Sequence, residues 1–499
     1  MVALAAPLFG GCAVGPDFAP PDPQLPGTSF FGKPEPAVPS ATPAALAIGK
    51  VAPVETTWWV TFHDLLLTSL EERVATANLD VATATFRLAE SRAQLGMVAS
   101  AALPAVNGNA SYDRALFSEN GVVSLLQPLV PAGTSFSVPP VSIWQTGFDA
   151  SWEIDLWGHV RRGIETAGAQ AEAAEEDRRN VLISVLAELA RDYVQLRSTQ
   201  KQIAITRQNL TTNSDILELT KTRAAGGLTS QLDVKNAAAQ VASVRASLPD
   251  LESQESMQIN ALCILLDEPP LALKNELSRV KPIPPAPPRV PLGIPSELAR
   301  RRPDIRQAEA SLHAQTAGIG VAVAEFYPRV TLNGNVGFNA LDLKNIFKAS
   351  SLQYIIGPSV SLPIFDGGRL KSQLELREVQ QQEAAVAYHK TVLQAWREVV
   401  DALVAYRKEQ QRRARLAEQV DFSRSVLSLS RDRYEEGAID FLTVLDAERT
   451  LLGAELAEAQ SIAAVSTDVV QLYKALGGGW EQTFAEKPLA QAENVPRVQ

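Results

Sequence analysis

The chain has little of the chemistry on which most active sites depend. Its 499 residues include only two cysteines and four histidines. The histidines, His63, His159, His313 and His389, stand far apart, with no metal-ligand spacing, glycine-rich phosphate loop or nucleophile motif beside them. We therefore expect that the protein is not an enzyme and that it binds no metal or other cofactor.

Positive charge and long apolar runs are also scarce. The formal net charge is −10, which argues against nucleic acid as the main partner and favours cations at any charged interior. No uninterrupted apolar run reaches the roughly 20 residues that a membrane-spanning helix needs. If the chain crosses a membrane, it must do so with strands.

The two cysteines lie in different settings. Cys263, within INALCILLDE, is predicted to be a small buried side chain on a helix. Cys12 ends the apolar start MVALAAPLFGGC, which resembles a bacterial lipoprotein signal. Residues 1–11 are predicted to be a signal peptide, truncated because the positive n-region is missing, and Cys12 is predicted to be acylated. The alternative is an ordinary apolar start with an unmodified thiol.

Proline marks the segment that follows Cys12. Eleven of the 32 prolines fall within the first 53 residues. Residues 12–57 are therefore expected to be extended, as a tether or a strap laid along another surface.

A helical segment is predicted at about 64–102, after Trp58 and Trp59. Two segments then alternate with the period of β-strands. From Trp144 to Asp155, apolar and aromatic residues occupy one face and polar or acidic residues the other. With a weaker alternation after Pro104, this predicts strands at about 104–118 and 141–156. The pair fits either a soluble hairpin packed on a core or two strands of a membrane barrel, where aromatic residues face outward.

Very long helices follow the strands. Residues 158–223 contain no proline and have aliphatic residues at intervals of seven, from Leu182 to Leu217. A helix of this length extends about 100 Å at 1.5 Å per residue. A break at Ala224–Leu228 precedes a second helix, predicted at 229–266.

The same plan occurs twice. A shift of 210 residues carries Leu182 onto Val392, Gly227 onto Gly437 and Leu232 onto Leu442, and the shift becomes 224 for the first strand of each pair. The difference places a change of loop length between the strands. The second strand pair is predicted at 328–342 and 354–366, and its helices at 367–433 and 439–476. The predicted domains are a first repeat at 58–280, a Pro-rich linker at 281–295, a second repeat at 296–480 and a tail at 481–499.

No single copy can complete this plan. Helices of about 100 Å exceed the diameter of a compact domain, so they must pack side by side as a bundle or tube. Four strands cannot close a membrane barrel, whose smallest form has about eight, and an open edge in lipid leaves backbone groups unsatisfied. Several copies must therefore share one barrel, and three copies would give 12 strands and a matching ring of helices. The predicted fold is mainly α and internally duplicated, with long coiled-coil helices and four membrane β-barrel strands per chain.

The turn between the last two helices carries the candidate functional residues. Gly437 interrupts RYEEGAIDFLTVLDAER, residues 433–449, as a residue just past a helix end would. Beyond it, Leu442, Asp446 and Arg449 lie on or beside a coiled-coil seam. Charges at this place fit either a solvated helix end or a constriction at the tip of a helical hairpin.

These features together resemble the TolC family of outer-membrane efflux proteins, in particular its lipoprotein branch serving resistance-nodulation-division pumps. The motifs that carry the resemblance are CAVGPDF from Cys12, RRPDIR from Arg301, PIFDGGR from Pro363, VLDA from Val444 and YKALGGGW from Tyr473. The resemblance implies a homotrimer. Its long helices form a trimeric α-barrel, a tunnel through the periplasm, and its four strands per chain form a 12-stranded β-barrel in outer-membrane lipid. It also implies two protein partners, a periplasmic adaptor and an inner-membrane resistance-nodulation-division transporter.

The same resemblance implies which residues form the site. Leu442, Asp446, Arg449 and Asp233 match the positions of the family's periplasmic gate. Thr443 stands where some members have a second Asp, which predicts a thinner acidic ring. The expected adaptor contacts are in the two tip turns: Gly226, Gly227, Leu228, Gly437, Ala438 and Asp440.

The function implied is a passive exit duct for drugs or other small toxic solutes, opened at its periplasmic tip by adaptor and pump. One alternative is the outer-membrane duct of a type I protein secretion system. The lipoprotein start and RRPDIR favour the solute pump over this alternative. Another is a structural coiled-coil protein without a pore, against which the strand pairs argue.

Overall fold

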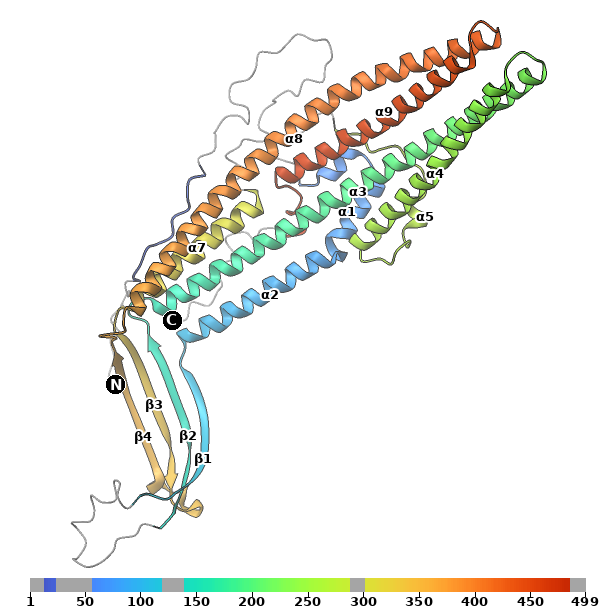
Figure 1. Cartoon of the computed structure of the whole chain (residues 1–499). Helices are drawn as coiled ribbons and strands as arrows, with labels where there is room; N and C mark the ends of the chain where they lie inside the picture. Colours follow the sequence, from blue (N-terminus) through green and yellow to red (C-terminus); the bar gives the residue numbers. More distant parts are fainter. Residues whose placement is uncertain (1–12, 24–55, 119–138, 288–300, 485–499) are drawn as a thin grey trace, which may run out of the picture. The chain divides into compact units, whose positions relative to one another are not determined.

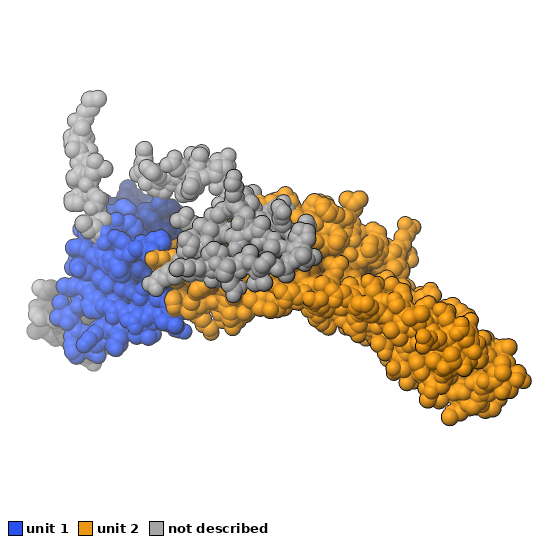
Figure 2. Space-filling model, turned by 90° about the horizontal axis from the view of Figure 1, so that it is seen from above, with its two compact units in different colours: residues 1–20, 89–172, 310–386 blue, residues 21–88, 173–309, 387–499 orange. Residues whose placement is uncertain are grey.

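The computed structural model describes residues 13–23, 56–118, 139–287 and 301–484 (Figure 1). The chain forms two compact units, shown in two colours in Figure 2. Unit 1 comprises residues 1–20, 89–172 and 310–386, and unit 2 comprises 21–88, 173–309 and 387–499. Each unit takes segments from both predicted repeats, because the long helices of each repeat pass through both units. Within the described residues, no helix combines the length and the apolar character that crossing a bilayer requires.

Unit 1 contains one antiparallel sheet in the order β1-β2-β3-β4. Its strands are β1 (Ala105–Ala115), β2 (Val141–Ile154), β3 (Arg329–Ala340) and β4 (Leu352–Ser361). All four predicted strands are present, and the pairing of β2 with β3 joins the two hairpins. The residues between β1 and β2, 116–140, outnumber those between β3 and β4, 341–351, as the change of shift requires.

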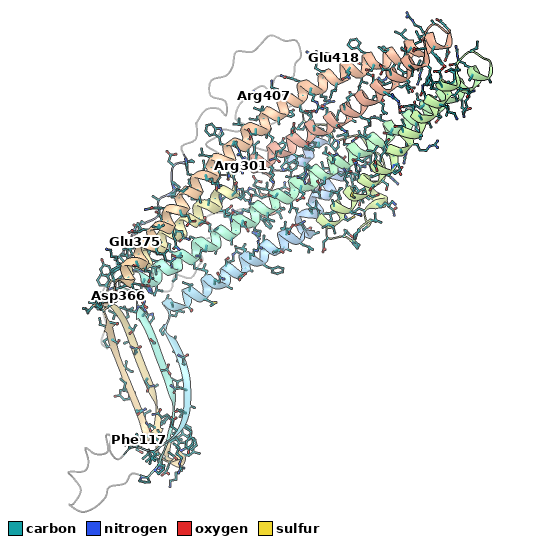
Figure 3. The ribbon with its side chains drawn as sticks, in the orientation of Figure 1. Phe117, Arg301, Asp366, Glu375, Arg407 and Glu418 are labelled. Carbon is teal, nitrogen blue, oxygen red and sulfur yellow. The ribbon has the colours of Figure 1, made fainter. Side chains whose placement is uncertain are left out.

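The predicted end of the fourth strand, at residue 366, is wrong. β4 ends at Ser361, two residues before Pro363, which cannot donate a ladder hydrogen bond. Asp366, labelled in Figure 3, instead caps the helix that follows. Its carboxylate accepts hydrogen bonds from the backbone N–H groups of Gly368 and Leu370, each at 2.9 Å, and these bonds lower the pKa of Asp366.

The two faces of the sheet differ in chemistry as the alternation predicts. On one face, Asn109 donates to Asp149 at 2.9 Å and Ser151 to Asn333 at 3.0 Å. The other face has large apolar side chains exposed across the strands: Val106, Phe148, Leu332, Val336, Tyr354, Ile356 and Val360. A contiguous apolar patch of this kind marks a surface that another apolar phase covers.

The helices repeat almost identically. Both α3 (His159–Ala225) and α8 (Arg369–Glu435) have 67 residues, and both α4 (Gln231–Leu265) and α9 (Phe441–Ala475) have 35. The equal lengths confirm the internal duplication, and each helix starts and ends within a few residues of its prediction.

The helices before the strands are less regular than predicted. The expected single helix after Trp59 is two helices, α1 (Leu65–Ala77) and α2 (Leu79–Ala99). Asn78 separates them: its Oδ1 accepts from the N–H of Asp80 at 2.9 Å, and its Nδ2 donates to the Leu265 carbonyl at 2.9 Å. In the second repeat, α7 (Pro303–Ala324) begins at proline, which suits the first turn of a helix. The short α5 (Lys274–Leu277) follows α4.

The largest apolar core lies in unit 2. Trp58 stacks on Tyr473 with ring centroids 5.5 Å apart, and Leu182, Leu189 and Leu196 of the seven-residue series are fully buried beside them. Cys263 is a buried free thiol in the same cluster, as predicted. Residues 13–20 belong to unit 1, where Val14 N–H donates to the Trp157 carbonyl at 3.0 Å and Asp17 pairs with Arg162. The predicted acylation site Cys12, like residues 1–11, lies outside the described residues.

Gly147 of β2 faces Gly337 of β3, where neither position has room for a side chain. A Cβ at Gly147 would lie 2.5 Å from the Val336 carbonyl oxygen. We expect Gly147→Ala to destabilise the sheet by about 1–3 kcal/mol, since overpacking forces the backbone to shift. The measurement is thermal unfolding in detergent, followed by the β signal in circular dichroism.

Gly357→Ala in β4 is the matched control, because a Cβ there meets no atom within 4 Å. Its melting temperature should stay near that of the unchanged protein. Equal losses in both variants would contradict the role assigned to the Gly147–Gly337 approach.

Candidate functional site

The two helical hairpins of unit 2 end in turns of the same construction. At the α3–α4 turn, the N–H of Leu228 donates to the Arg223 carbonyl at 2.8 Å, and at the α8–α9 turn the N–H of Ala438 donates to Arg433 at 2.9 Å. Each turn contains a glycine with positive φ: +72° at Gly227 and +77° at Gly437. This is a helix-terminating motif whose left-handed residue is almost always glycine.

The following helices also begin alike. Ser230 accepts from the N–H of Asp233 at 3.2 Å, and Asp440 accepts from the N–H of Thr443 at 3.0 Å. The Asp233 carboxylate in turn accepts a hydrogen bond from the backbone N–H of Ser230, which completes a capping box. Hydrogen bonds from the Thr229 and Ser230 hydroxyls, each 2.7 Å long, lower the pKa of Asp233. The predicted gate acid Asp233 therefore has a carboxylate that is engaged by its own turn.

Two arginines connect the hairpins to each other near the tips. Arg223 of α3 donates from Nη1 to the Glu435 carbonyl at 2.8 Å and lies over the Tyr434 ring, 4.8 Å from its centroid. Arg449 of α9 donates from Nε to Oε1 of Gln240 on α4 at 2.9 Å. Both bonds join an arginine to a neutral oxygen.

The three other predicted gate residues lie on one side of α9. Leu442 is 54% exposed, and Asp446 and Arg449 are exposed too, at steps of four and three along the helix. Within the described residues the hydrogen-bond partner of Arg449 is the Gln240 amide, and the Asp446 carboxylate has no ion-pair partner there.

Sequence reasoning missed several residues of this region. Gln240 and Arg223 contact the other hairpin. The repeat offered no signal for Gln240, because its counterpart is Thr450. Glu448, only 1% exposed, pairs with Arg431 at 2.9 Å and connects α8 to α9. Burial raises the pKa of Glu448, against the opposing effect of Arg431.

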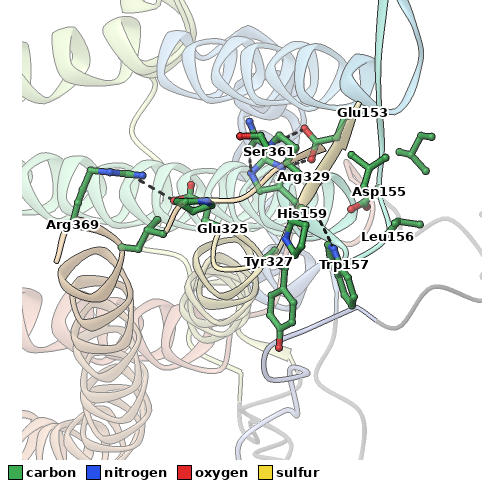
Figure 4. A pocket seen from close by; sticks show the side chains of 16 residues that line it. Glu153, Asp155, Leu156, Trp157, His159, Glu325, Tyr327, Arg329, Ser361 and Arg369 are labelled. Atoms are coloured by element: carbon green, nitrogen blue, oxygen red, sulfur yellow. Dashed lines mark hydrogen bonds and ion pairs between the residues drawn. The ribbon is translucent and has the colours of Figure 1, made fainter. Parts of the chain in front are cut away.

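Unit 1 contains a second polar cluster where β2 passes into α3 (Figure 4). A cavity of about 360 Å³ lies there, lined by residues at the ends of the strands and at the adjoining ends of the helices. Glu153 binds His159 at 3.1 Å and Arg329 at 3.4 Å, and Trp157 donates to the Pro328 carbonyl at 3.0 Å. These side chains are one another's hydrogen-bond and ion-pair partners, which indicates a structural role in joining strand to helix. No group of three or more metal-ligating side chains gathers anywhere in the part of the chain that the structure describes.

Comparison with known proteins identifies the family. The family model described as outer membrane efflux protein matches residues 71–266 and 294–478, which correspond to both repeats. The chain belongs to the outer membrane efflux protein family. Its outer-membrane location and its part in efflux, both predicted from the sequence, are confirmed by this membership.

Individual members of the family resemble the chain over nearly its full length. The solvent efflux pump outer membrane protein SrpC from Pseudomonas putida is 30% identical over 480 residues, which cover 95% of this chain and 96% of SrpC. The outer-membrane channel OprN superposes with a TM-score of 0.84 at 34% identity, over 94% of this chain and 100% of that one. The open state of the MtrE outer membrane channel from Neisseria gonorrhoeae gives 0.79 at 26%, over 94% and 99%.

The tip turn of this family member offers a direct test at Gly437. We expect Gly437→Val to destabilise the α8–α9 turn by at least about 1–2 kcal/mol, because a side chain at positive φ is strained. The measurement is the rate of limited proteolysis at residues 433–440, with crosslinking to the adaptor as a second readout.

Gly453→Val in α9 is the control, since nothing lies within 4 Å of a Cβ there. It should leave both readouts unchanged. If Gly437→Val is cleaved no faster than this control and crosslinks normally, the turn does not depend on a left-handed residue.

Proposed function

We propose that the protein is the outer-membrane duct of a tripartite efflux pump. It works as a homotrimer, with no catalytic step of its own, and passes small toxic solutes outward. Its partners in this proposal are a periplasmic adaptor and an inner-membrane resistance-nodulation-division transporter, which supplies the energy. The observation that carries the proposal is a difference between the repeats. Val426 on α8 is exposed, whereas its counterpart one repeat earlier, Ile216 on α3, is buried.

The sheet supports a shared barrel. β1 and β4 each have one neighbour, so each has an edge of unpaired backbone groups. Such an edge cannot stay open in lipid, while the exposed apolar face of the same sheet suits lipid. Three copies would give 12 strands, above the minimum of about eight for a closed membrane barrel.

The helices support the same assembly. Ile216 on α3 is 7% exposed, because it packs in a cluster with residues of α8 and α9. Its counterpart one repeat later, Val426 on α8, is 53% exposed. Phe422 and Leu429 extend this exposed apolar row at helical spacing. A second copy that presents its own first repeat would cover the row as α8 and α9 cover Ile216.

The hairpin tips support a gate at the periplasmic end. In a ring of copies, the side of α9 that bears Leu442, Asp446 and Arg449 faces the axis. An apolar ring there would dewet, and a ring of Asp446 carboxylates would repel anions and hold cations. The Arg449–Gln240 bond holds one hairpin to the other. A hydrogen bond from a charged group contributes about 1.5–3 kcal/mol, so the adaptor and pump can break three of them with the energy of their own contacts.

The name of one relative favours small apolar cargo. SrpC is described as part of a solvent efflux pump. In this proposal the duct itself does not select cargo, since selection belongs to the transporter.

Replacing Leu442, Asp446 and Arg449 together by Ala tests the gate. We expect higher conductance in planar lipid bilayers and uptake of large antibiotics by cells, because both rings and the hairpin bond are lost. The control is Thr450→Ala, at an exposed position one helical turn beyond Asp446 that has neither a charge nor a large apolar side chain. Conductance that equals the control in the triple variant would remove these residues from the gate.

A further inference from the structure

A second leucine occupies the position of Leu442 in the other hairpin. Leu232 is the second residue of α4, as Leu442 is the second residue of α9, and the repeat shift carries one onto the other. Leu232 is 67% exposed, against 54% for Leu442. Single exposed leucines are common on protein surfaces. Two at the same place in both halves of a duplicated chain need a common cause.

The backbone around the two leucines is built alike. Two residues before each leucine is the N-cap residue of its helix, Ser230 or Asp440. The side-chain oxygen of this residue accepts a hydrogen bond from the backbone N–H three residues later. Each helix also follows a turn with glycine at positive φ. The two side chains therefore leave their helices at equivalent points and in equivalent directions.

The two helix starts are also near each other. Hydrogen bonds from Thr443 lower the pKa of Asp440, and the negative charge of the nearby Asp233 carboxylate opposes this effect. The Arg223–Glu435 and Arg449–Gln240 bonds join the same hairpins on either side of this point. Leu232 and Leu442 thus lie at neighbouring ends of two connected hairpins.

The charged gate residues are not repeated in this way. The counterparts of Asp446 and Arg449 in α4 are Asn236 and Ala239. Of the three gate residues on α9, only the leucine is kept in both hairpins. Three copies of the chain would therefore contribute three of each charge and six leucines.

We propose that Leu232 and Leu442 together form one apolar ring of six leucines at the periplasmic constriction. The proposal rests on the trimeric duct proposed above and adds to it a gate residue from the first hairpin. A ring made of Leu442 alone would have a gap at each first hairpin, where water and ions could pass. Leucines at all six helix starts close those gaps and allow the ring to dewet.

Single-channel conductance in planar bilayers tests this with Leu232→Ala, Leu442→Ala and the double variant. The ring predicts that each single variant raises conductance by a similar amount and that the double variant raises it further. Leu376→Ala is the matched control, because Leu376 on α8 is 53% exposed, lies outside both tip turns, and has a threonine, Thr166, as its counterpart one repeat earlier. It should conduct like the unchanged protein.

The other outcomes separate two failures. If only Leu442→Ala raises conductance, Leu232 is not in the ring, while the proposed gate stands. If neither leucine matters, the proposed gate itself fails. If Leu376→Ala has the same effect as Leu232→Ala, the change reports the general loss of an exposed leucine and overturns the ring.

A crosslink provides a second readout that does not depend on truncation. The Leu232→Cys/Leu442→Cys double variant should form disulfides on mild oxidation in the closed channel, lower its conductance, and recover on reduction. Closed channels that form no crosslink between these positions would contradict the ring.

Discussion

An open sheet that cannot close on itself is the constraint on which the rest of the structure depends. β1 and β4 have unpaired edges, and one face of the sheet is apolar and exposed. In lipid every backbone group must find a partner within the protein, and in the proposed trimer strands from other copies complete the sheet. Each strand pair leads into one pair of long helices, so in this proposal the helices of the copies surround the same axis as the strands.

The residues that α3 buries change from mainly apolar to partly polar toward the tips. Near the Trp58–Tyr473 stack its buried residues are leucines, Leu182, Leu189 and Leu196, whereas nearer the turn they include Asn209, Asn213 and Thr220. Polar residues in a coiled-coil seam fix register and reduce stability. Near the tips the hairpins share a second, smaller apolar cluster, and two arginines bound to neutral oxygens also join them. A smaller core and more polar contacts at the tips suit the proposed duct, which opens at that end.

The fold could be predicted from the sequence because its signals are long and occur twice. The 210-residue shift locates α3 against α8 and α4 against α9, and the alternation around Trp152 locates the sheet. The break at Asn78 was missed, since it depends on a bond to the distant Leu265 carbonyl. Leu442, Asp446 and Arg449 could be found from the motif. The bond from Arg449 to Gln240 could not, because it joins two hairpins whose side chains differ between the repeats.

The mass of the purified protein in mild detergent tests the central claim most directly. If paired strands and long helices are completed only by other copies, multi-angle light scattering should give the mass of three chains after subtraction of the detergent. The same sample should show β signal in circular dichroism. A monomer that keeps its β signal would show that four strands close without partners and would contradict the account.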